Sequence, residues 1–397
     1  MKILSVNAGS SSLKFTAFEM PEEKVLASGY FERVGIPNSF YTIKINGEKI
    51  KKEVDLPDHT TAFKILTEEL MALHVVSSLD EIKGVGHRVV QGGVYADSVV
   101  IDEEVMQNIR KYTDLAPLHN PAAIKGILAA QEVIPEATHV AVFDTAFHQT
   151  MPQENYLYAV PEEWYTDYQV RRYGAHGTSH KYITQKVSEM LGRDDLKLII
   201  CHIGSGASIT ATKNGKSIDT SMGFTPNAGL IMGTRSGDID ATILTYMMEK
   251  AHLSISEIND LLNKKSGVYA LSGGYSDMRD VTEQIENGDE KAKLAMKMFI
   301  NRIIDYIAKY YFELEGCDAI ILTAGVGENG ALERKLIADK LKFLGVELDE
   351  EMNNKIAGYK DLSERCITTK NSTIPIYVVP TNEELMIAKN AYNFSEK

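Results

Sequence analysis

Residues 3–15, ILSVNAGSSSLKF, place two strand-like apolar runs on either side of a glycine and three serines, and a turn at Pro21 precedes a third strand-like run. Residues 198–221, LIICHIGSGASITATKNGKSIDTS, repeat this order, with an Asn-Gly hairpin signal before the third strand. Asn7 and His202 occupy corresponding places in the two stretches. The repetition predicts a duplicated architecture, and the alternative is a chance resemblance of two β-hairpins.

Strands and helices alternate along the rest of the chain, which indicates the α/β class. Ser179 is expected to cap a helix that Gly192 ends, and an apolar strand over 374–380 leads into a last helix over 383–392. A long helix is expected from near Asp289 to Gly316. Its apolar stripe, expected in the core or at a subunit interface, consists of Leu294, Met298, Ile304, Ile307 and Tyr311.

Length and composition describe an ordinary globular protein. The 397 residues are enough for two or three domains, and a net charge of −13 argues against a general nucleic-acid binder. The three cysteines, Cys201, Cys317 and Cys366, are far apart and form no C-x-x-C, so neither a disulfide framework nor a structural zinc site is expected. No apolar run approaches the ~20 residues of a membrane span. We therefore expect a cytoplasmic protein without membrane or nucleic-acid partners.

The turn over residues 9–12 has the composition of a phosphate-binding loop. Small residues let the backbone approach a phosphate closely, and turn amides and the hydroxyls of Ser10 and Ser12 can bind its oxygens. Lys14 adds a cation on the same strand face as Ser12. A plain serine-rich turn is the alternative, but residues 204–208 and 324–330 are two more glycine loops directly after apolar strands. Three such loops suit a nucleotide bound in a cleft.

Two arginines stand beside glycine-rich turns. Arg88 precedes Gly92 and Gly93, and Arg235 precedes a helix expected from about residue 240, so each could bind a carboxylate or phosphate in bidentate fashion. A surface ion pair is the alternative for either one alone.

His176 and His180 are four residues apart, a spacing that could indicate metal ligands on a helix. Gly177 and the expected cap at Ser179 argue against this, since His176 then lies before the helix. A histidine at a helix N-terminus does lie near a natural anion site.

Two carboxylates complete the candidate set. Asp144 ends an apolar strand, and Glu383 opens the last helix, where Thr381 and Glu384 spell a capping box that leaves Glu383 free to face elsewhere. Magnesium usually takes one or two protein carboxylates and several waters. Asp144 and Glu383 are therefore candidate magnesium ligands.

Ten ordered motifs, spread from Asn7 to the last helix, together resemble acetate kinases. They are VNAGSSSLKF, GHRVV.GG, APLHNPA, AVFDTAFH, RRYGAHGTSH, CHIGSGAS, DTSMGFTP..GL.MGTRSGDID, SDMRD, TAGVGENG and PTNEELMIA. The resemblance implies a duplicated ribonuclease-H-like (actin-like ATPase) fold with two domains around a nucleotide cleft, and a homodimer. We expect one domain over 1–148 plus 382–397 and the other over 149–381, the latter with most of the ATP site and the dimer interface.

The reaction implied by the resemblance is the reversible phosphorylation of acetate by ATP, which yields acetyl phosphate and ADP with Mg²⁺ as cofactor and Mn²⁺ as its possible substitute. The catalytic residues implied are Asp144, His176 and Arg235, and the metal residues are Asn7 and Glu383. Arg88 would bind the acetate carboxylate, and the methyl pocket would be walled by Val90, Leu118 and Pro226. The ATP residues implied are Lys14, His202, Ile203, Gly204, Ser205, Gly206, Asp277, Met278, Arg279, Gly325, Val326, Gly327, Glu328 and Asn329.

Acetate is already ionised at pH 7, because a carboxylic acid of the glutamate kind ordinarily has a pKa of about 4.3, and it needs no strong general base. Asp144 is then better suited to holding magnesium waters or orienting the attacking oxygen. Phosphoryl transfer depends mostly on positioning and charge stabilisation, which suits Arg235 with His176.

The chain departs from the acetate kinase pattern at three places: Gln91 to Val94 stand where HGGE is common, Ser205 stands where HxGNG has Asn, and Ala175 stands where Phe is common. The loss of an aromatic wall at Ala175 could enlarge the methyl pocket, so propionate is a plausible second substrate. An ATP-driven conformational module of the heat-shock ATPase kind is the alternative from another class. Arg88 argues for a kinase, since a nucleotide switch needs no clamp for a substrate carboxylate.

Overall fold

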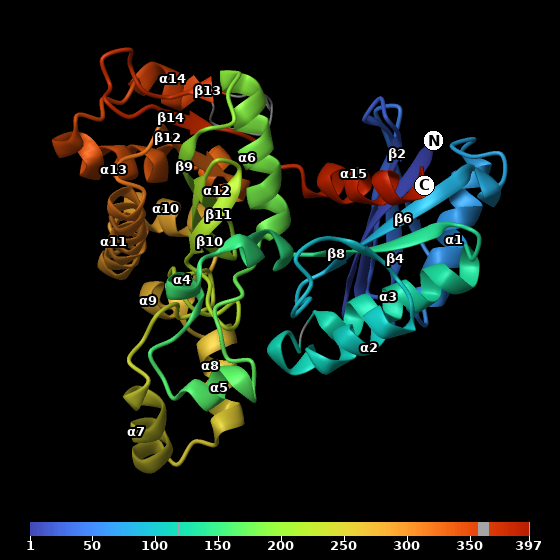
Figure 1. The fold of residues 1–397 in the computed structure, drawn as a ribbon, viewed down its shortest axis with the longest axis horizontal. Coiled ribbons are helices and arrows are strands. Elements are labelled where there is room, and N and C mark those ends of the chain that lie inside the picture. The colour runs from blue at the N-terminus through green and yellow to red at the C-terminus, as the bar shows by residue number, and fades with distance from the viewer. Residues whose placement is uncertain (118, 356–364, 397) are drawn as a thin grey trace. The chain divides into compact units, whose positions relative to one another are not determined.

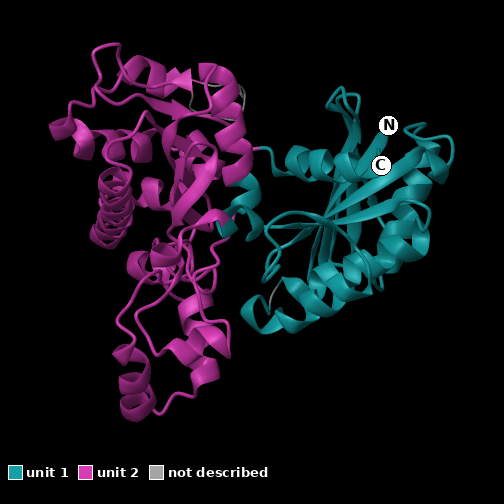
Figure 2. Cartoon of the chain, in the orientation of Figure 1, with its two compact units in different colours: residues 1–149, 177–179, 382–397 teal, residues 150–176, 180–381 magenta. Residues whose placement is uncertain are grey.

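The structure is a computed structural model that describes residues 1–117, 119–355 and 365–396. The chain divides into two compact units, residues 1–149, 177–179 and 382–397 (unit 1) and residues 150–176 and 180–381 (unit 2) (Figure 2). The first expected boundary, 148/149, lies one residue before the observed division at 149/150, and the second, 381/382, is the same. In addition, residues 177–179 belong to unit 1, whereas they were expected in the other domain.

Unit 1 is built on an eight-stranded sheet with the order β5-β4-β3-β2-β1-β6-β8-β7 (Figure 1). Neighbours from β5 to β1 are antiparallel, whereas β6 is parallel to both β1 and β8. The strands are β1 (Lys2–Gly9), β2 (Ser12–Glu19), β3 (Lys24–Glu32), β4 (Phe40–Ile45), β5 (Glu48–Glu53), β6 (Ile82–Val89), β7 (Val99–Val100) and β8 (Thr138–Phe143).

Unit 2 is built on a six-stranded sheet with the order β11-β10-β9-β12-β14-β13. Here too three antiparallel strands come first, and β12 is parallel to both β9 and β14. The strands are β9 (Lys197–Ile203), β10 (Ala207–Lys213), β11 (Lys216–Thr220), β12 (Ala319–Thr323), β13 (Arg365–Cys366) and β14 (Ile376–Val378).

The two sheets share one core topology: a three-stranded antiparallel meander followed by two parallel strands. The order β3-β2-β1-β6-β8 of unit 1 corresponds to β11-β10-β9-β12-β14 of unit 2. In register, Asn7 lies opposite Lys14 and His202 lies opposite Ser208. The predicted duplication and the α/β fold class are therefore confirmed.

Four helices belong to the sheet of unit 1: α1 (His59–Ala72), α2 (Glu103–Lys111), α3 (Asn120–Val133) and α15 (Glu383–Ser395). The buried apolar residues of α1 pack with those of β1, β2 and β3 in one cluster. Helix α15 crosses β6, where a Cβ on Gly86 would stand 2.6 Å from Ile387 Cγ2 and 2.8 Å from the Ile387 carbonyl oxygen. Glycine at this place lets the helix backbone lie against the strand.

Unit 2 holds most of the helices, and α11 (Glu290–Glu313) packs on β9 and β10. The others are α4 (Gln153–Tyr156), α5 (Glu162–Thr166), α6 (Gly177–Leu191), α7 (Thr242–Ala251), α8 (Ile255–Lys264), α9 (Gly267–Ser272), α10 (Met278–Glu286), α12 (Ala324–Asn329), α13 (Ala331–Leu341) and α14 (Glu350–Lys355). Short 3-10 helices are η1 (Leu79–Glu81) and η2 (Thr113–Leu115) in unit 1, η3 (Ala146–Thr150), which spans the division at 149/150, and η4 (Lys342–Leu344) in unit 2.

The long helix lies where it was expected, and its predicted stripe is only partly in the core: Ile307 is buried, Ile304 and Tyr311 are partly buried, and the alternative of a subunit interface stays a prediction. Leu294 and Met298 are 53% and 38% exposed. The side chains that α11 buries are Ala292, Ala295, Met296, Phe299, Ile300, Ile303, Ile307 and Tyr310. A stripe chosen by large apolar residues alone missed the two alanines.

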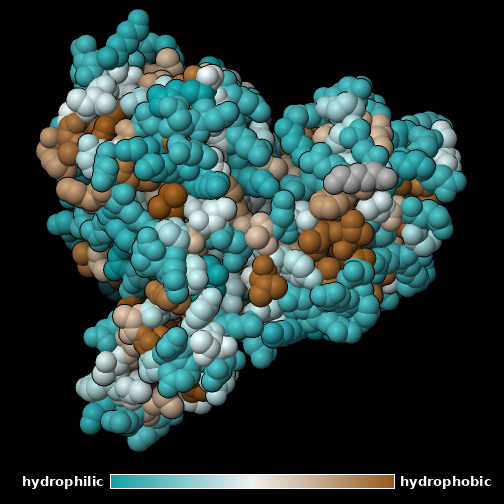
Figure 3. All heavy atoms as spheres, in the orientation of Figure 1, coloured by the Kyte–Doolittle hydropathy of each residue, from teal (hydrophilic) through white to brown (hydrophobic). Residues whose placement is uncertain are grey.

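Two predicted helix caps are also wrong. Helix α6 begins at Gly177, two residues before Ser179, and His176 is at its N-cap position. Helix α15 is capped by Asn382, whose side chain accepts from the Leu385 N–H, and not by Thr381. Among the described residues no helix combines the length and apolar character needed to cross a membrane. The surface drawn in Figure 3 is largely hydrophilic, with apolar side chains in scattered patches.

Candidate active site

Unit 1 brings Arg88 and Asp144 together. Arg88 is the penultimate residue of β6 and Asp144 directly follows the parallel neighbour β8. Arg88 Nη2 lies 2.7 Å from Asp144 Oδ2 and Nε lies 3.1 Å from the same oxygen, while the carboxylate is 2% exposed. The Asp144 charge raises the pKa of Arg88, which opposes the effect of burial. The pair is therefore a fixed, charged bidentate contact at the carboxyl edge of the sheet.

The segment 177–178 completes the surroundings of Asp144. The hydroxyl of Thr178 donates to Asp144 Oδ1 at 3.1 Å, and the Gly177 N–H donates to the Asp144 carbonyl at 2.8 Å. A Cβ on Gly177 would stand 2.3 Å from that carbonyl oxygen, so glycine is required there. Thr178 was not among the predicted site residues, although it lies inside the motif RRYGAHGTSH.

The start of α15 places two carboxylates in unit 1. Lys14 Nζ donates to Glu384 Oε1 at 2.6 Å, so Glu384 has a partner outside its own helix and is not a capping-box residue. Burial would raise the pKa of Glu384, but Lys14 lowers it. The pKa of Glu383 is raised, first by burial and then by the charges of Asp144 and Glu384, against the opposing effect of Arg88.

The turn at residues 9–12 is tightly held. A Cβ on Gly9 would stand 2.5 Å from the Ser12 hydroxyl oxygen, and His59 Nε2 lies 2.9 Å from the Gly9 carbonyl oxygen. Ser10 is exposed and Ser12 is half-buried. This geometry is compatible with a phosphate loop, and the roles of the two serines stay predictions.

In unit 2 three histidines gather around one hydroxyl. His176 Nδ1 lies 2.9 Å and His180 Nε2 lies 2.8 Å from Ser208 Oγ, and the rings of His176 and His202 stack with centroids 4.1 Å apart. His176 does precede the helix, as expected, but its left-handed φ of 57° turns it to the same serine as His180. Ser208 was missed. Its register opposite His202, the counterpart of Lys14 opposite Asn7, is the signal that could have found it.

Arg235 and His176 converge on Gly206. A Cβ on Gly206 would lie 3.5 Å from His176 Nε2 and 3.6 Å from Arg235 Nη1. Arg235 Nη1 donates to the Pro226 carbonyl at 3.1 Å, and within the described part of the chain no carboxylate pairs with it. Burial lowers the pKa of Arg235. A half-buried arginine held by a carbonyl rather than a carboxylate is suited to bind an anion.

Unit 2 also contains a cavity of about 590 Å³. Eight of the thirteen ATP residues implied for this unit line it: Gly204, Ser205, Asp277, Met278, Arg279, Gly325, Val326 and Asn329. Wall residues without a prior prediction are Gly233, Val268, Ser276, Thr282, Phe299, Gly330, Ala331, Leu332 and Glu333. Most of these come from α11, α13 and segments between helices; Gly233, Ser276 and Gly330 lie inside motifs quoted above, whereas no motif marks the residues of α11 and α13.

The other five residues implied for ATP, His202, Ile203, Gly206, Gly327 and Glu328, do not line this cavity. Glu328 accepts from the N–H groups of Ala324 at 2.8 Å and Thr381 at 3.1 Å, so its carboxylate is engaged by the backbone. The expected glycine loop at 324–330 is the short helix α12 over most of its length, with Ala324 at a φ of 65°.

The residues implied for the methyl pocket are found in both units. Val90 is buried in unit 1, while Pro226 is half-buried in unit 2 and Ala175 lies in its core. Leu118 lies outside the described residues.

Comparison with known proteins shows the same similarity along the whole chain. The model of the acetokinase family matches residues 2–389. An acetate kinase of Bacillus cytotoxicus is 52% identical over 392 residues, which cover 98% of each chain. Among solved structures, the acetate kinase of Porphyromonas gingivalis (43% identical, TM-score 0.92) and a propionate kinase of Francisella tularensis (42% identical, TM-score 0.93) each match over 99% of both chains.

The duplicated α/β fold, the glycine-lined cavity and these matches define a kinase of the actin-like ATPase class. Within that class, the chain belongs to the acetokinase family.

Proposed function

We propose that this enzyme transfers the γ-phosphoryl group of ATP to a carboxylate oxygen of acetate, reversibly, with acetyl phosphate and ADP as products. In this reaction an oxygen of acetate forms the new bond to phosphorus, and the bond from phosphorus to the β,γ-bridging oxygen breaks. The pairing of half-buried Arg88 with buried Asp144 is the observation that carries the proposal, because a nucleotide-driven switch has no use for a carboxylate clamp. Its relatives named acetate kinase support the choice of acetate.

The roles of the other residues follow from their surroundings. We assign the cavity of about 590 Å³ to ATP or ADP, a volume that suits a ligand of this size. His176 and Arg235, which converge on Gly206, would stabilise the charge of the transferring phosphoryl group. Arg88 would bind the acetate carboxylate while Asp144 fixes the plane of the guanidinium group.

Magnesium fits the residues at the start of α15. Glu383 is a half-buried carboxylate whose pKa is raised by desolvation and by the neighbouring charge of Asp144, and a divalent cation would offset that repulsion. We propose Asn7 and Glu383 as its residues, with Mn²⁺ as a possible substitute. The ion supplies neutralisation of phosphate charge when it is bound.

Propionate is the second candidate substrate. Ala175 offers less volume than the phenylalanine common in acetate kinases, and one solved relative is named a propionate kinase. One methylene discriminates by only about 1–3 kcal/mol, so activity on both acids is expected.

A cytoplasmic homodimer is the state we propose. The three cysteines are free thiols, as in a reducing compartment. Large apolar side chains of unit 2 are exposed on α5, α7 and α11, among them Trp164, Tyr246 and Phe312, and could be covered by a second copy. Light scattering across a range of concentrations tests the dimer.

A hydroxamate assay of acyl phosphate tests the function directly. The purified enzyme is incubated with ATP, Mg²⁺ and acetate, propionate or butyrate in separate reactions, and hydroxylamine traps the product. Acyl phosphate from acetate is expected, with a smaller yield from propionate. Formation from none of the three acids would refute the proposal and favour an ATPase without a small-acid substrate.

A further inference from the structure

We propose that Arg172 is a positioning residue for phosphoryl transfer. It ties the segment that carries His176 to the segment that carries Pro226 and, through the Pro226 carbonyl, sets the orientation of Arg235. This inference rests on the proposed function, because it concerns the same transfer site.

The guanidinium group of Arg172 holds three consecutive carbonyls after β11. Its Nη1 donates to the carbonyl oxygens of Thr220 at 2.7 Å, Ser221 at 3.4 Å and Met222 at 3.3 Å. These carbonyls end the β11 strand and begin the loop that leads to Pro226. One planar group therefore fixes the direction in which the chain leaves the sheet.

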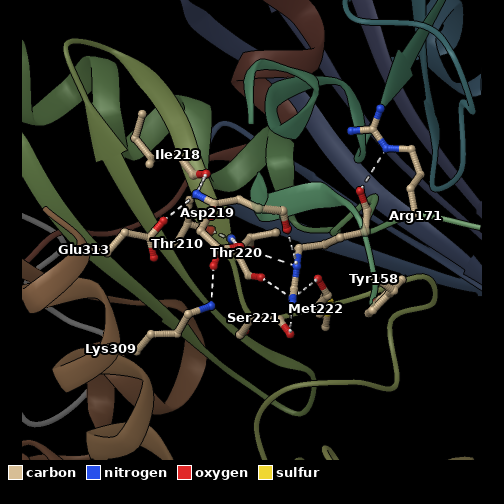
Figure 4. Close-up of polar contacts among 12 residues, drawn as sticks. Tyr158, Arg171, Thr210, Ile218, Asp219, Thr220, Ser221, Met222, Lys309 and Glu313 are labelled. Carbon is tan, nitrogen blue, oxygen red and sulfur yellow. Dashed lines mark hydrogen bonds and ion pairs between the residues drawn. The ribbon is translucent and has the colours of Figure 1, made fainter. Parts of the chain in front are cut away.

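A buried acid holds the arginine in turn. Arg172 Nε lies 3.5 Å from Oδ1 of Asp219, whose side chain is 2% exposed, and Lys309 forms an ion pair with the other oxygen. Figure 4 shows Asp219 among Thr220, Lys309 and Glu313, which come from β11 and α11. Burial would lower the pKa of Arg172, but the charge of Asp219 raises it, so the arginine stays charged.

Groups facing Asp219 come from several elements. Helix α11 contributes Lys309, Glu313, Tyr306 and Tyr310. The segment after α5 contributes Arg172.

The backbone beside Arg172 binds the same loop. The N–H groups of Tyr173 and Gly174 both donate to the Gly223 carbonyl at 3.1 Å, and Gly174 precedes His176 by two residues. On the other side of the loop, the Phe224 N–H donates to the Tyr158 hydroxyl at 2.9 Å. Hydrogen bonds therefore join the segment 172–176 to the segment 220–224.

The loop that follows β11 also fixes Arg235. Arg235 Nη1 donates to the Pro226 carbonyl at 3.1 Å, and Met232 Sδ at 3.7 Å is a weaker second acceptor. No carboxylate among the described residues fixes the Arg235 guanidinium, so a displacement of Pro226 would displace it. A misplacement of about 1 Å can cost about 10²-fold in rate.

Arg172→Lys tests the proposal, because lysine keeps the charge but has one nitrogen in place of the two, Nη1 and Nε, with which Arg172 contacts the three carbonyls and Asp219. We expect kcat to fall roughly 10- to 100-fold while the ATP dissociation constant, measured by calorimetry, changes less than about threefold. An unchanged kcat, or an equal loss of nucleotide affinity, would overturn the positioning role.

A double-mutant cycle separates positioning from a general effect on folding. If Arg172 acts through Arg235, Arg172→Lys should cost less than about threefold in an Arg235→Ala background. If Arg172 merely stabilises the fold of unit 2, the fold-losses in kcat of Arg172→Lys and Arg235→Ala should multiply in the double variant, and this result would refute the inference. Asp219→Asn removes the negative charge and keeps the shape of the side chain, and it should show the same non-additive pattern with a smaller loss in kcat. This variant remains informative should Arg172→Lys fail to fold.

Arg171→Ala is the matched control. The neighbouring arginine stacks on Tyr156 at 3.8 Å and donates to the Arg172 carbonyl, and Figure 4 shows its side chain turned away from Ser221 and Met222. Its kcat should stay within about threefold of the parent enzyme, and a loss equal to that of Arg172→Lys would overturn the proposal. Absence of acyl phosphate with the parent enzyme would instead defeat the proposed function itself, so the two failures are distinguishable.

Discussion

Arg235→Ala is the most direct test of the transfer site. Arg235 is half-buried, pairs with no carboxylate in the described chain, and converges with His176 on Gly206, so its charge is available to a bound anion. An arginine that acts on a transferring phosphoryl group is worth about 10³–10⁵ in kcat. We take the lower end and expect a loss of about 10³-fold, or about 4 kcal/mol of transition-state stabilisation, with a modest change in KM.

The assay is steady-state kinetics of acyl phosphate formation with acetate and ATP varied separately. Arg279→Ala is the matched control, since this arginine lines the nucleotide cavity with an 80% exposed side chain and pairs with Asp277. It should raise the KM for ATP and leave kcat nearly unchanged. If Arg235→Ala changed KM alone, its contact would exist equally in the ground state and the assigned role would be wrong.

Three further outcomes are expected. His87 and His139 share a buried hydrogen bond, and burial is the first cause that lowers the pKa of each. The free energy of unfolding should therefore be at its full value above about pH 6.5 and fall below it by up to about 1.4 kcal/mol per pH unit for each histidine. A urea unfolding midpoint that stays constant from pH 7 to 5 would contradict this. Gly86→Ala should push α15 from β6, lowering stability by about 1–3 kcal/mol and raising the Mg²⁺ needed for half-maximal activity; an unchanged Mg²⁺ titration would disprove the link to α15. Arg334→Met should cost about 3 kcal/mol in urea unfolding because it leaves the buried oxygens of Asn353 without their donor, and a loss under about 1 kcal/mol would argue otherwise.

The duplicated sheets could be predicted because their signals are local. Alternating apolar residues and a turn of small residues mark the first hairpin of each sheet without reference to distant parts of the chain, and an Asn-Gly pair marks the next hairpin of unit 2. The same holds for Asp144, which directly follows an apolar strand, and for Gly204 and Ser205, which follow another and line the cavity.

Other features depend on contacts that a linear pattern does not contain. The face that α11 buries includes Ala292 and Ala295, whereas Leu294 and Met298 of the predicted stripe are exposed. Ser208 was missed because its importance comes from histidines on another element. Arg172 joins carbonyls about fifty residues further along the chain, and such side chain to backbone contacts have no period or spacing.

Helix α15 belongs to unit 1 although the whole of unit 2 precedes it in the chain. Its buried residues, Leu385, Met386, Ile387, Ala388 and Ala391, cover β1, β6 and β8. During synthesis, a ribosome therefore releases the last part of the first unit only after the second unit has been made. Unit 2 can complete its sheet first, while β6 stays uncovered on one face until residues 382–397 emerge. The domain that begins first is thus the one that is finished last, and the uncovered sheet is the stage most exposed to aggregation or to chaperone binding.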